Sequence, residues 1–84
     1  MSWLEQNNKL TRTFSFKKQT KLAEFVLNIA KIADKMNHHP DYEIRKCSEL
    51  HISLSTHDKN GITEKDYALA EIIDMELKNW ALKR

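Results

Sequence analysis

Histidine is the residue type that points most directly to chemistry in this chain of 84 residues, which contains four of them. Three of the four lie in two short segments: residues 37–42, NHHPDY, hold His38 and His39, and residues 55–58, STHD, hold His57. An imidazole has an unperturbed pKa of about 6.5, so it both gives and takes protons near neutral pH. Several imidazoles around one pocket suit a reaction that protonates one atom while it deprotonates another.

Other catalytic machinery is not evident in the sequence. The single glycine, Gly61, leaves no glycine-rich loop for phosphates, and no serine stands in a nucleophile-elbow motif. Cys47 lies in a polar segment without a catalytic motif around it. Acid–base catalysis by the histidines is therefore the strongest catalytic hypothesis.

The same residues have two other uses. Metal binding by the three histidines and Asp58 competes with acid–base chemistry, although adjacent histidine side chains tend to diverge and no cysteine pair indicates structural zinc. Structural roles compete as well, because a single histidine serves equally well at the surface or at a helix end. Asp66, in the same way, serves as the N-terminal acid of a helix.

Alternating side chains indicate the strands that hold these segments. The predicted strands are residues 3–6, 10–16, 42–46 and 50–57. Asn7 and Asn8 would join the first two strands as a hairpin, and residues 46–49 would join the last two. His51 and His57 would then share one strand and, being six residues apart, one face of the sheet.

Apolar side chains that recur every three or four residues predict two amphipathic helices, from about residue 20 to 36 and from about residue 63 to 82. Asn37 suits the end of the first helix, and Pro40 cannot continue it. Thr63 and Asp66 resemble a capping box at the start of the second helix, with Asp in place of the usual Glu. The loop before it contains an Asn-Gly pair, which tolerates positive φ.

The order β-β-α-β-β-α predicts an α+β fold, in which a four-stranded antiparallel sheet carries two long helices packed on one face. Residues 1–84 form one domain in this prediction, because a chain of this length buries only one modest core. His38 and His39 then follow a helix and His57 ends a strand. Both segments lie where short loops are held by a rigid scaffold.

The composition limits which binding partners and which cellular compartment we expect. The 14 Lys and Arg against 12 Asp and Glu give a net charge of +2, which gives no reason to expect direct nucleic-acid or membrane binding. A single cysteine, Cys47, together with the lack of a signal peptide or a long apolar run, predicts a soluble, cytoplasmic protein.

The two histidine segments and the start of the second helix together resemble the pterin-4a-carbinolamine dehydratase family. The shared features are HHPDY at residues 38–42, a strand ending in STHD at residues 55–58, and GITEKD at residues 61–66 with Leu69 and Ala70 on the following helix. The order and spacing of these motifs make the resemblance specific. Tyr42 departs from the tryptophan that many members carry at that position.

This resemblance implies dehydration of a 4a-hydroxytetrahydropterin to quinonoid dihydropterin, without metal or organic cofactor, in the recycling of tetrahydrobiopterin. The family's active-site histidines correspond to His38, His39 and His57, and its acidic residue corresponds to Asp66. We expect His38 and His57 to act as acids on the leaving hydroxyl, and His39 to contact the ring or take the N5 proton. Asp66 is expected to orient His57 or to cap the helix. The supporting or substrate-binding positions are Pro40, Asp41, Tyr42, Thr56 and Asp58.

An unpaired sheet edge invites pairing with a second copy, so we expect a homodimer or homotetramer. A second function also stays open beside catalysis. Animal members of the family act as dimerisation partners of a homeodomain transcription factor, so the alternative is a non-catalytic interaction module. A metal-dependent hydrolase that uses the same histidines is a third hypothesis.

Overall fold

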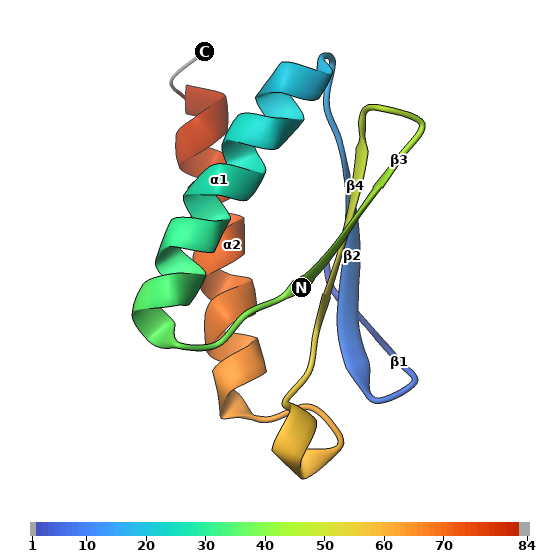
Figure 1. Ribbon diagram of the computed structural model, residues 1–84, viewed down its shortest axis with the longest axis vertical. Helices are drawn as coiled ribbons and strands as arrows, with labels where there is room; N and C mark the ends of the chain where they lie inside the picture. The colour runs from blue at the N-terminus through green and yellow to red at the C-terminus, as the bar shows by residue number, and fades with distance from the viewer. Residues whose placement is uncertain (1, 83–84) are drawn as a thin grey trace.

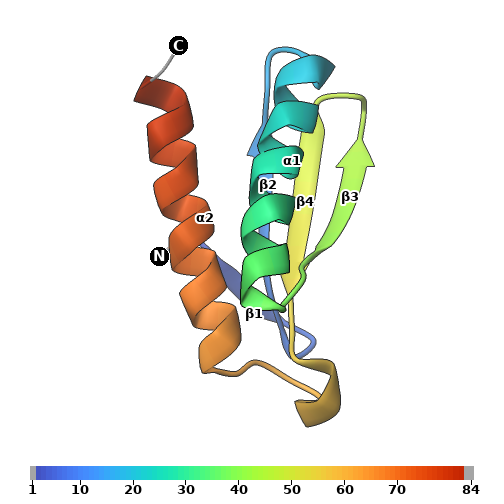
Figure 2. The same ribbon diagram turned by 60° about the vertical axis from the view of Figure 1, so that its left-hand side comes forward.

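The computed structural model describes residues 2–82, and its main elements follow the order β-β-α-β-β-α. They are β1 (Leu4–Gln6), β2 (Lys9–Ser15), α1 (Gln19–Met36), β3 (Asp41–Arg45), β4 (Glu49–Leu54), the short 3-10 helix η1 (His57–Lys59) and α2 (Glu64–Leu82). The two long helices lie on the same side of one four-stranded antiparallel sheet (Figures 1 and 2). The predicted α+β fold is confirmed.

The sheet has the strand order β1-β2-β4-β3, so β1 and β3 form its two edges. Leu10 of β2 pairs with Leu54 of β4, and Tyr42 of β3 pairs with Ile52 of β4. Because side chains alternate along a strand, the buried Leu54 and Ile52 face the helices, whereas His51 faces the opposite side. Glu49 and Ser53 lie on the same side of β4 as His51, so the outer face of the sheet is largely polar, although Leu4 of β1 is exposed there.

Both hairpins close through short turns that contain two residues with positive φ. Asn7 and Asn8 form a two-residue turn between β1 and β2, and Lys46, Cys47 and Ser48 form a three-residue turn between β3 and β4. The residues with positive φ are Asn7, Asn8, Lys46 and Cys47, with φ between 51° and 62°. A two-residue turn with positive φ at both positions matches the right-handed twist of the flanking strands, and asparagine adopts it readily. Cys47 is exposed in its turn.

One hydrophobic core fills the space between the sheet and the helices. Its buried members are Trp3, Leu10, Phe14, Leu22, Phe25, Ile29, Leu50, Ile52, Leu54, Leu69, Ala70 and Ile73. Phe25 of α1 lies at its centre, with its ring centroid 5.6 Å from that of Phe14 and 6.3 Å from that of Trp80. Burial of such a side chain contributes roughly 1.5–3 kcal/mol, so these aromatic contacts hold α1 against the sheet and α2.

The last strand is shorter than the sequence predicts. It ends at Leu54, and His57 begins η1 instead of ending the strand, so His51 and His57 do not share a strand face. The physical reason is local: the Thr56 amide donates to the Gly61 carbonyl at 2.8 Å, which closes a small loop and turns the chain out of the sheet. None of the described helices is both long and apolar enough to cross a membrane.

Candidate active site

The first histidine segment is positioned by the end of α1. Asn37 adopts the left-handed conformation, with φ 53°, and its amide donates to the carbonyls of Ala33 and Asp34. The His38 amide donates to the Ala33 carbonyl at 3.2 Å, which satisfies the last turn of the helix. Pro40 is buried directly after and leads into β3. The helix therefore stops where it presents two consecutive histidines beside the sheet.

The second segment is a tight loop between β4 and α2. The Lys59 amide donates to the Thr56 carbonyl at 3.1 Å, and the Asn60 amide donates to the His57 carbonyl at 3.2 Å. Asn60 carries the positive φ, 53°, and Gly61 does not, so the Asn-Gly pair uses asparagine for the left-handed position. His57 is exposed at the first position of η1.

The start of α2 confirms the predicted capping box. The Thr63 amide donates to Asp66 Oδ2 at 2.9 Å, and Thr63 Oγ1 accepts from the Lys65 amide at 3.3 Å. These two bonds satisfy amide groups that the first turn of a helix leaves without intrahelical partners. Asp66 thus has the structural role that its sequence position predicts, but it has a second role as well.

Asp66 also joins the two histidine segments. Its side chain is fully buried, and its Oδ1 accepts a hydrogen bond from His38 Nε2 at 2.6 Å. Its Oδ2 accepts from Thr56 Oγ1 at 2.9 Å. The expectation that Asp66 orients His57 is therefore wrong: Asp66 orients His38 directly and holds Thr56, the residue before His57. A carboxylate oxygen only accepts, so the shared proton of the pair belongs to His38 Nε2 and Nδ1 is the free ring nitrogen.

His39 turns to a different carboxylate. Its Nε2 donates to Asp34 Oδ1 on α1 at 2.9 Å, and both side chains are exposed. The adjacent histidines therefore diverge, as neighbouring side chains tend to do, and each has its Nε2 fixed by an acid from a different helix. Among residues 2–82, no three His, Cys, Asp or Glu side chains gather into a group that could hold a metal ion.

The three histidines nevertheless line one cavity of about 340 Å³, which we call the histidine cavity. His38 and His39 enter it from the end of α1, and His57 enters it from η1. Of the other predicted positions, four line it: Pro40, Asp41, Thr56 and Asp58. Asp66 lies behind the wall, bonded to His38, and Tyr42 is not part of the lining.

Four polar residues of this region were not predicted as site residues. Asn37, Ser55 and Lys65 line the histidine cavity, and Asp34 holds His39. Asp34 stands five residues before His39, and His39 lies beyond the end of α1, so helix spacing gave no signal for their contact. Lys65 had no signal either, because a lysine in the first turn of a helix is common on exposed surfaces.

The role of Tyr42 comes from the packing of its ring and not from its hydroxyl group. The hydroxyl oxygen is buried and has no hydrogen-bond partner among the described residues. Burial, and secondarily the negative charge of Asp34, raises the pKa of Tyr42 from 10.0 to about 12. The phenol is therefore neutral at any pH at which the protein would act, and it cannot serve as a base there.

Replacing Tyr42 by phenylalanine is expected to leave the free energy of unfolding unchanged or to raise it by up to about 1 kcal/mol, because a buried hydroxyl without a partner is removed. Because the folded pKa lies above the unfolded one, wild-type stability should also fall as the pH rises from 10 toward 12, and the variant should lose less. Urea unfolding between pH 7 and pH 11.5 measures both effects.

The matched variant Tyr67→Phe serves as the control for the stability gain. The Tyr67 hydroxyl donates to Glu5 Oε1 at 2.5 Å, so its removal breaks a hydrogen bond that is actually made. This variant should not be stabilised. A loss of more than about 1 kcal/mol in Tyr42→Phe would show instead that the Tyr42 hydroxyl has a partner in solution.

Comparison with known proteins identifies a family whose sequence profile this chain matches. Residues 1–76 match the sequence profile of a family described as pterin 4 alpha carbinolamine dehydratase. A protein of Sulfolobus acidocaldarius that bears this enzyme name provisionally is 46% identical over 72 residues, which cover 86% of this chain and 78% of the relative. A similarly named protein of Chloroflexus aggregans is 45% identical over 71 residues, which cover 84% of this chain and 74% of the relative.

Two solved structures share the fold. One, a transcriptional coactivator/pterin dehydratase from Brucella melitensis, superposes with a TM-score of 0.83 at 28% identity and covers 89% of this chain and 81% of its own. The other is a pterin dehydratase-like protein identified as a RuBisCO assembly factor in the alpha-carboxysome, with a TM-score of 0.75 at 22% identity over 90% of this chain and 89% of its own. Because the family profile spans nearly the whole chain and the curated relatives exceed 40% identity, this chain belongs to the pterin-4-alpha-carbinolamine dehydratase family.

Proposed function

We propose that the protein is a 4a-hydroxytetrahydropterin dehydratase, which converts pterin-4a-carbinolamine to quinonoid dihydropterin and water. The observation that carries the proposal is that His38, His39 and His57 line one cavity, although they come from two separate segments of the chain. Membership of the family supplies the substrate class. The quinonoid product is then available for reduction, so the reaction would serve tetrahydrobiopterin recycling after aromatic amino-acid hydroxylation.

The reaction needs one acid and one base. The C4a–O bond breaks as the hydroxyl receives a proton and leaves as water, and N5 loses its proton as the C4a–N5 double bond forms. Nothing is oxidised or reduced, so the atoms balance without a co-reactant or an organic cofactor. Positioned acids and bases typically contribute about 10²–10⁴-fold each to such proton transfers.

Each histidine is suited to one part of this chemistry. His57 has no side-chain partner among the described residues, so its ring is free to protonate the leaving hydroxyl. His38, held through Nε2 by Asp66, would assist with the acid Nδ1–H of its protonated form. His39, held through Nε2 by Asp34, would take the N5 proton with the lone pair of its neutral Nδ1.

A spectrophotometric dehydration assay on 4a-hydroxytetrahydropterin tests this proposal. We expect the protein to accelerate loss of the carbinolamine well beyond the spontaneous rate, and the rate to persist after dialysis against a chelator such as EDTA. A metal-dependent hydrolase would lose its activity in the chelator arm. A protein that leaves the spontaneous rate unchanged would overturn the enzymatic proposal and favour a binding role.

That binding role is the second candidate function: a non-catalytic interaction module. One of the two structural neighbours is a transcriptional coactivator/pterin dehydratase and the other is a RuBisCO assembly factor, so proteins of this fold include both kinds of function. The polar outer face of the sheet and its open edges, β1 and β3, offer surface for a partner. We propose that a second copy of the chain pairs at such an edge and gives a homodimer or homotetramer.

A further inference from the structure

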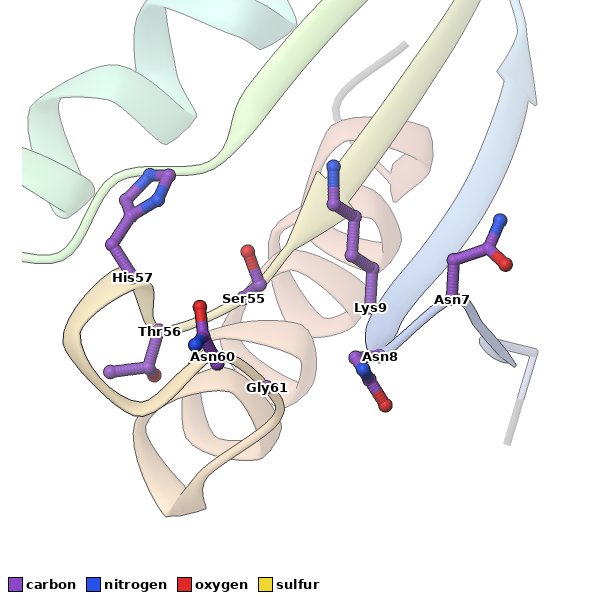
Figure 3. Close-up of a pocket in the computed structure, with 8 residues that line it drawn as sticks. All are labelled: Asn7, Asn8, Lys9, Ser55, Thr56, His57, Asn60 and Gly61. Atoms are coloured by element: carbon purple, nitrogen blue, oxygen red, sulfur yellow. The ribbon is translucent and has the colours of Figure 1, made fainter.

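A second cavity adjoins the histidine cavity; it shares His57 with it but has neither His38 nor His39 in its lining. It measures about 420 Å³ and lies between the turn that joins β1 to β2 and the loop that follows β4. We call it the Lys9 cavity. Its lining includes Lys9 and Asn60, and it shares Ser55, Thr56 and His57 with the histidine cavity. Figure 3 shows Lys9 and His57 on opposite walls, with Ser55 and Asn60 between them.

The structure of a pterin explains why such a neighbouring space matters. The atoms that react, C4a and N5, are bonded to each other, and the substituent-bearing C6 is the next ring atom after N5. A ring whose C4a–N5 edge faces the histidines must therefore direct its C6 substituent past one of them. His57 lies in the wall of both cavities, so the Lys9 cavity is the space that this substituent reaches when it passes His57.

The volumes of the two cavities are consistent with one ligand whose ring fills the histidine cavity and whose substituent fills the Lys9 cavity. Small-molecule sites usually measure about 300–1,000 Å³, and each cavity alone lies near the lower end of that range. The two together suit a bicyclic ring with a substituent of several heavy atoms.

The charge of the Lys9 cavity indicates what this substituent carries. Its lining contains Lys9 and His57 but no carboxylate, whereas Asp41 and Asp58 line the histidine cavity. The Lys9 ammonium forms no ion pair or side-chain hydrogen bond within residues 2–82. An ammonium group has three donors and no acceptor, and it binds phosphate and carboxylate groups as a point charge.

The neighbouring polar groups extend this preference. Neither Ser55 nor Asn60 uses its side chain in a hydrogen bond within the described part of the chain, so both are available to a hydroxyl or an anionic oxygen. The Thr56 hydroxyl is different, because it is engaged with Asp66 and Thr63. Asn7 and Asn8 carry less weight, since the turn geometry alone accounts for asparagine at those positions.

We propose that the Lys9 cavity binds the C6 substituent of the pterin substrate, and that Lys9 favours substituents ending in an anionic group. This inference rests on the proposed function for the choice of a pterin as the ligand. It makes Lys9 a specificity residue that lies far from the reacting bond and acts on a different part of the substrate.

The test compares two stable ligands that differ only in the charge of the substituent, 6-hydroxymethylpterin and its phosphate ester. Quenching of pterin fluorescence gives both Kd values. We expect wild-type protein to bind the ester about tenfold more tightly than the alcohol, in line with a hydrogen bond to a charged group. Lys9→Gln should reduce this ratio to within about twofold, because the amide keeps the length of the side chain but not its charge.

Lys31→Gln is the matched control. Lys31 is an exposed lysine on α1 that lines neither cavity, so its replacement changes the net charge equally and should preserve the preference for the ester. Equal affinity of wild-type protein for both pterins would overturn the proposal. So would a Lys9→Gln variant that retains the tenfold preference.

Inorganic phosphate is the third ligand, because a free anion offers the same chemistry as a phosphorylated substituent. If phosphate alone displaced the ester as effectively as unlabelled ester does, the cavity would be an anion site without a pterin, and the proposal would be wrong. The dehydration assay fails or succeeds independently. A protein without dehydratase activity that still prefers the ester through Lys9 would refute the proposed function and leave the binding inference standing.

Discussion

Replacing His57 by alanine is expected to lower kcat for dehydration of 4a-hydroxytetrahydropterin by about 10²–10⁴-fold, the usual contribution of a positioned acid or base. His57 is the cleanest of the three histidines to test, because its side chain is exposed and has no partner whose loss would disturb the fold. The free energy of unfolding should stay within about 0.5 kcal/mol of wild type. Stopped-flow kinetics with urea unfolding on the same samples measures both quantities.

His51 supplies the matched control that the chain itself offers. It lies on β4, where its Nδ1 forms a hydrogen bond of 2.9 Å with Thr13 Oγ1, and it lines neither cavity. His51→Ala should therefore keep wild-type kcat. Free imidazole should restore part of the activity of His57→Ala, because the cavity left behind is open to solvent. If His57→Ala and His51→Ala turned over substrate equally fast, the assignment of His57 as an acid would be wrong.

Replacing Asp66 by alanine is expected to lower the free energy of unfolding by about 3–5 kcal/mol, because it leaves His38 and Thr56 without their buried acceptor. In a domain of this size each kcal/mol shifts Tm by roughly 4–8 °C, so Tm should fall by more than about 12 °C. Activity should fall as well, because His38 loses the contact that fixes its ring. Differential scanning calorimetry measures the first effect and kcat the second.

Two further variants separate support of the fold from orientation of His38. Thr63→Ala removes the side-chain partner of the Lys65 amide and the contact of Thr63 Oγ1 with Thr56 Oγ1, but it leaves the bonds from His38 and Thr56 to Asp66 intact. It should cost about 1 kcal/mol and preserve kcat. Asp66→Asn keeps the shape of the side chain but cannot accept two sets of donors equally well, so kcat should fall at least tenfold with a smaller loss of stability than in Asp66→Ala. Equal kcat in Asp66→Asn and wild type would refute a positioning role.

Much of the fold follows from short-range patterns of apolar and polar side chains in the sequence. Alternation over residues 10–16 predicts a strand, and the structure places β2 at Lys9–Ser15. Spacings of three and four from residue 20 to 36 predict a helix, and α1 spans Gln19–Met36. These predictions succeed because a period of two or of 3.6 residues sets which side chains share a face, and burial of that face selects the element.

The error at the end of β4 shows where such reasoning stops. Ser55 and His57 continue the alternation of the strand, but Thr56 bonds to Gly61 and to Asp66 instead of to a neighbouring strand. Alternation cannot reveal this, because it records only side-chain polarity and not where the backbone amides find their partners. The carbonyl of Gly61, five residues away, accepts the Thr56 amide and ends the strand, and from Thr56 the Asp66 side chain accepts only the hydroxyl.

By itself, the sequence determined the elements, their order, the capping box and the histidines that could perform acid–base chemistry. Only the tertiary structure decided that Asp66 holds His38, 28 residues away, and not His57, nine residues away. The reason is that contacts between distant residues depend on how α1, α2 and the sheet pack around Phe25 and its neighbours, and no local pattern encodes that packing. The same holds for the Lys9 cavity, which exists because the strand order β1-β2-β4-β3 places the first turn of the chain beside the loop that carries His57.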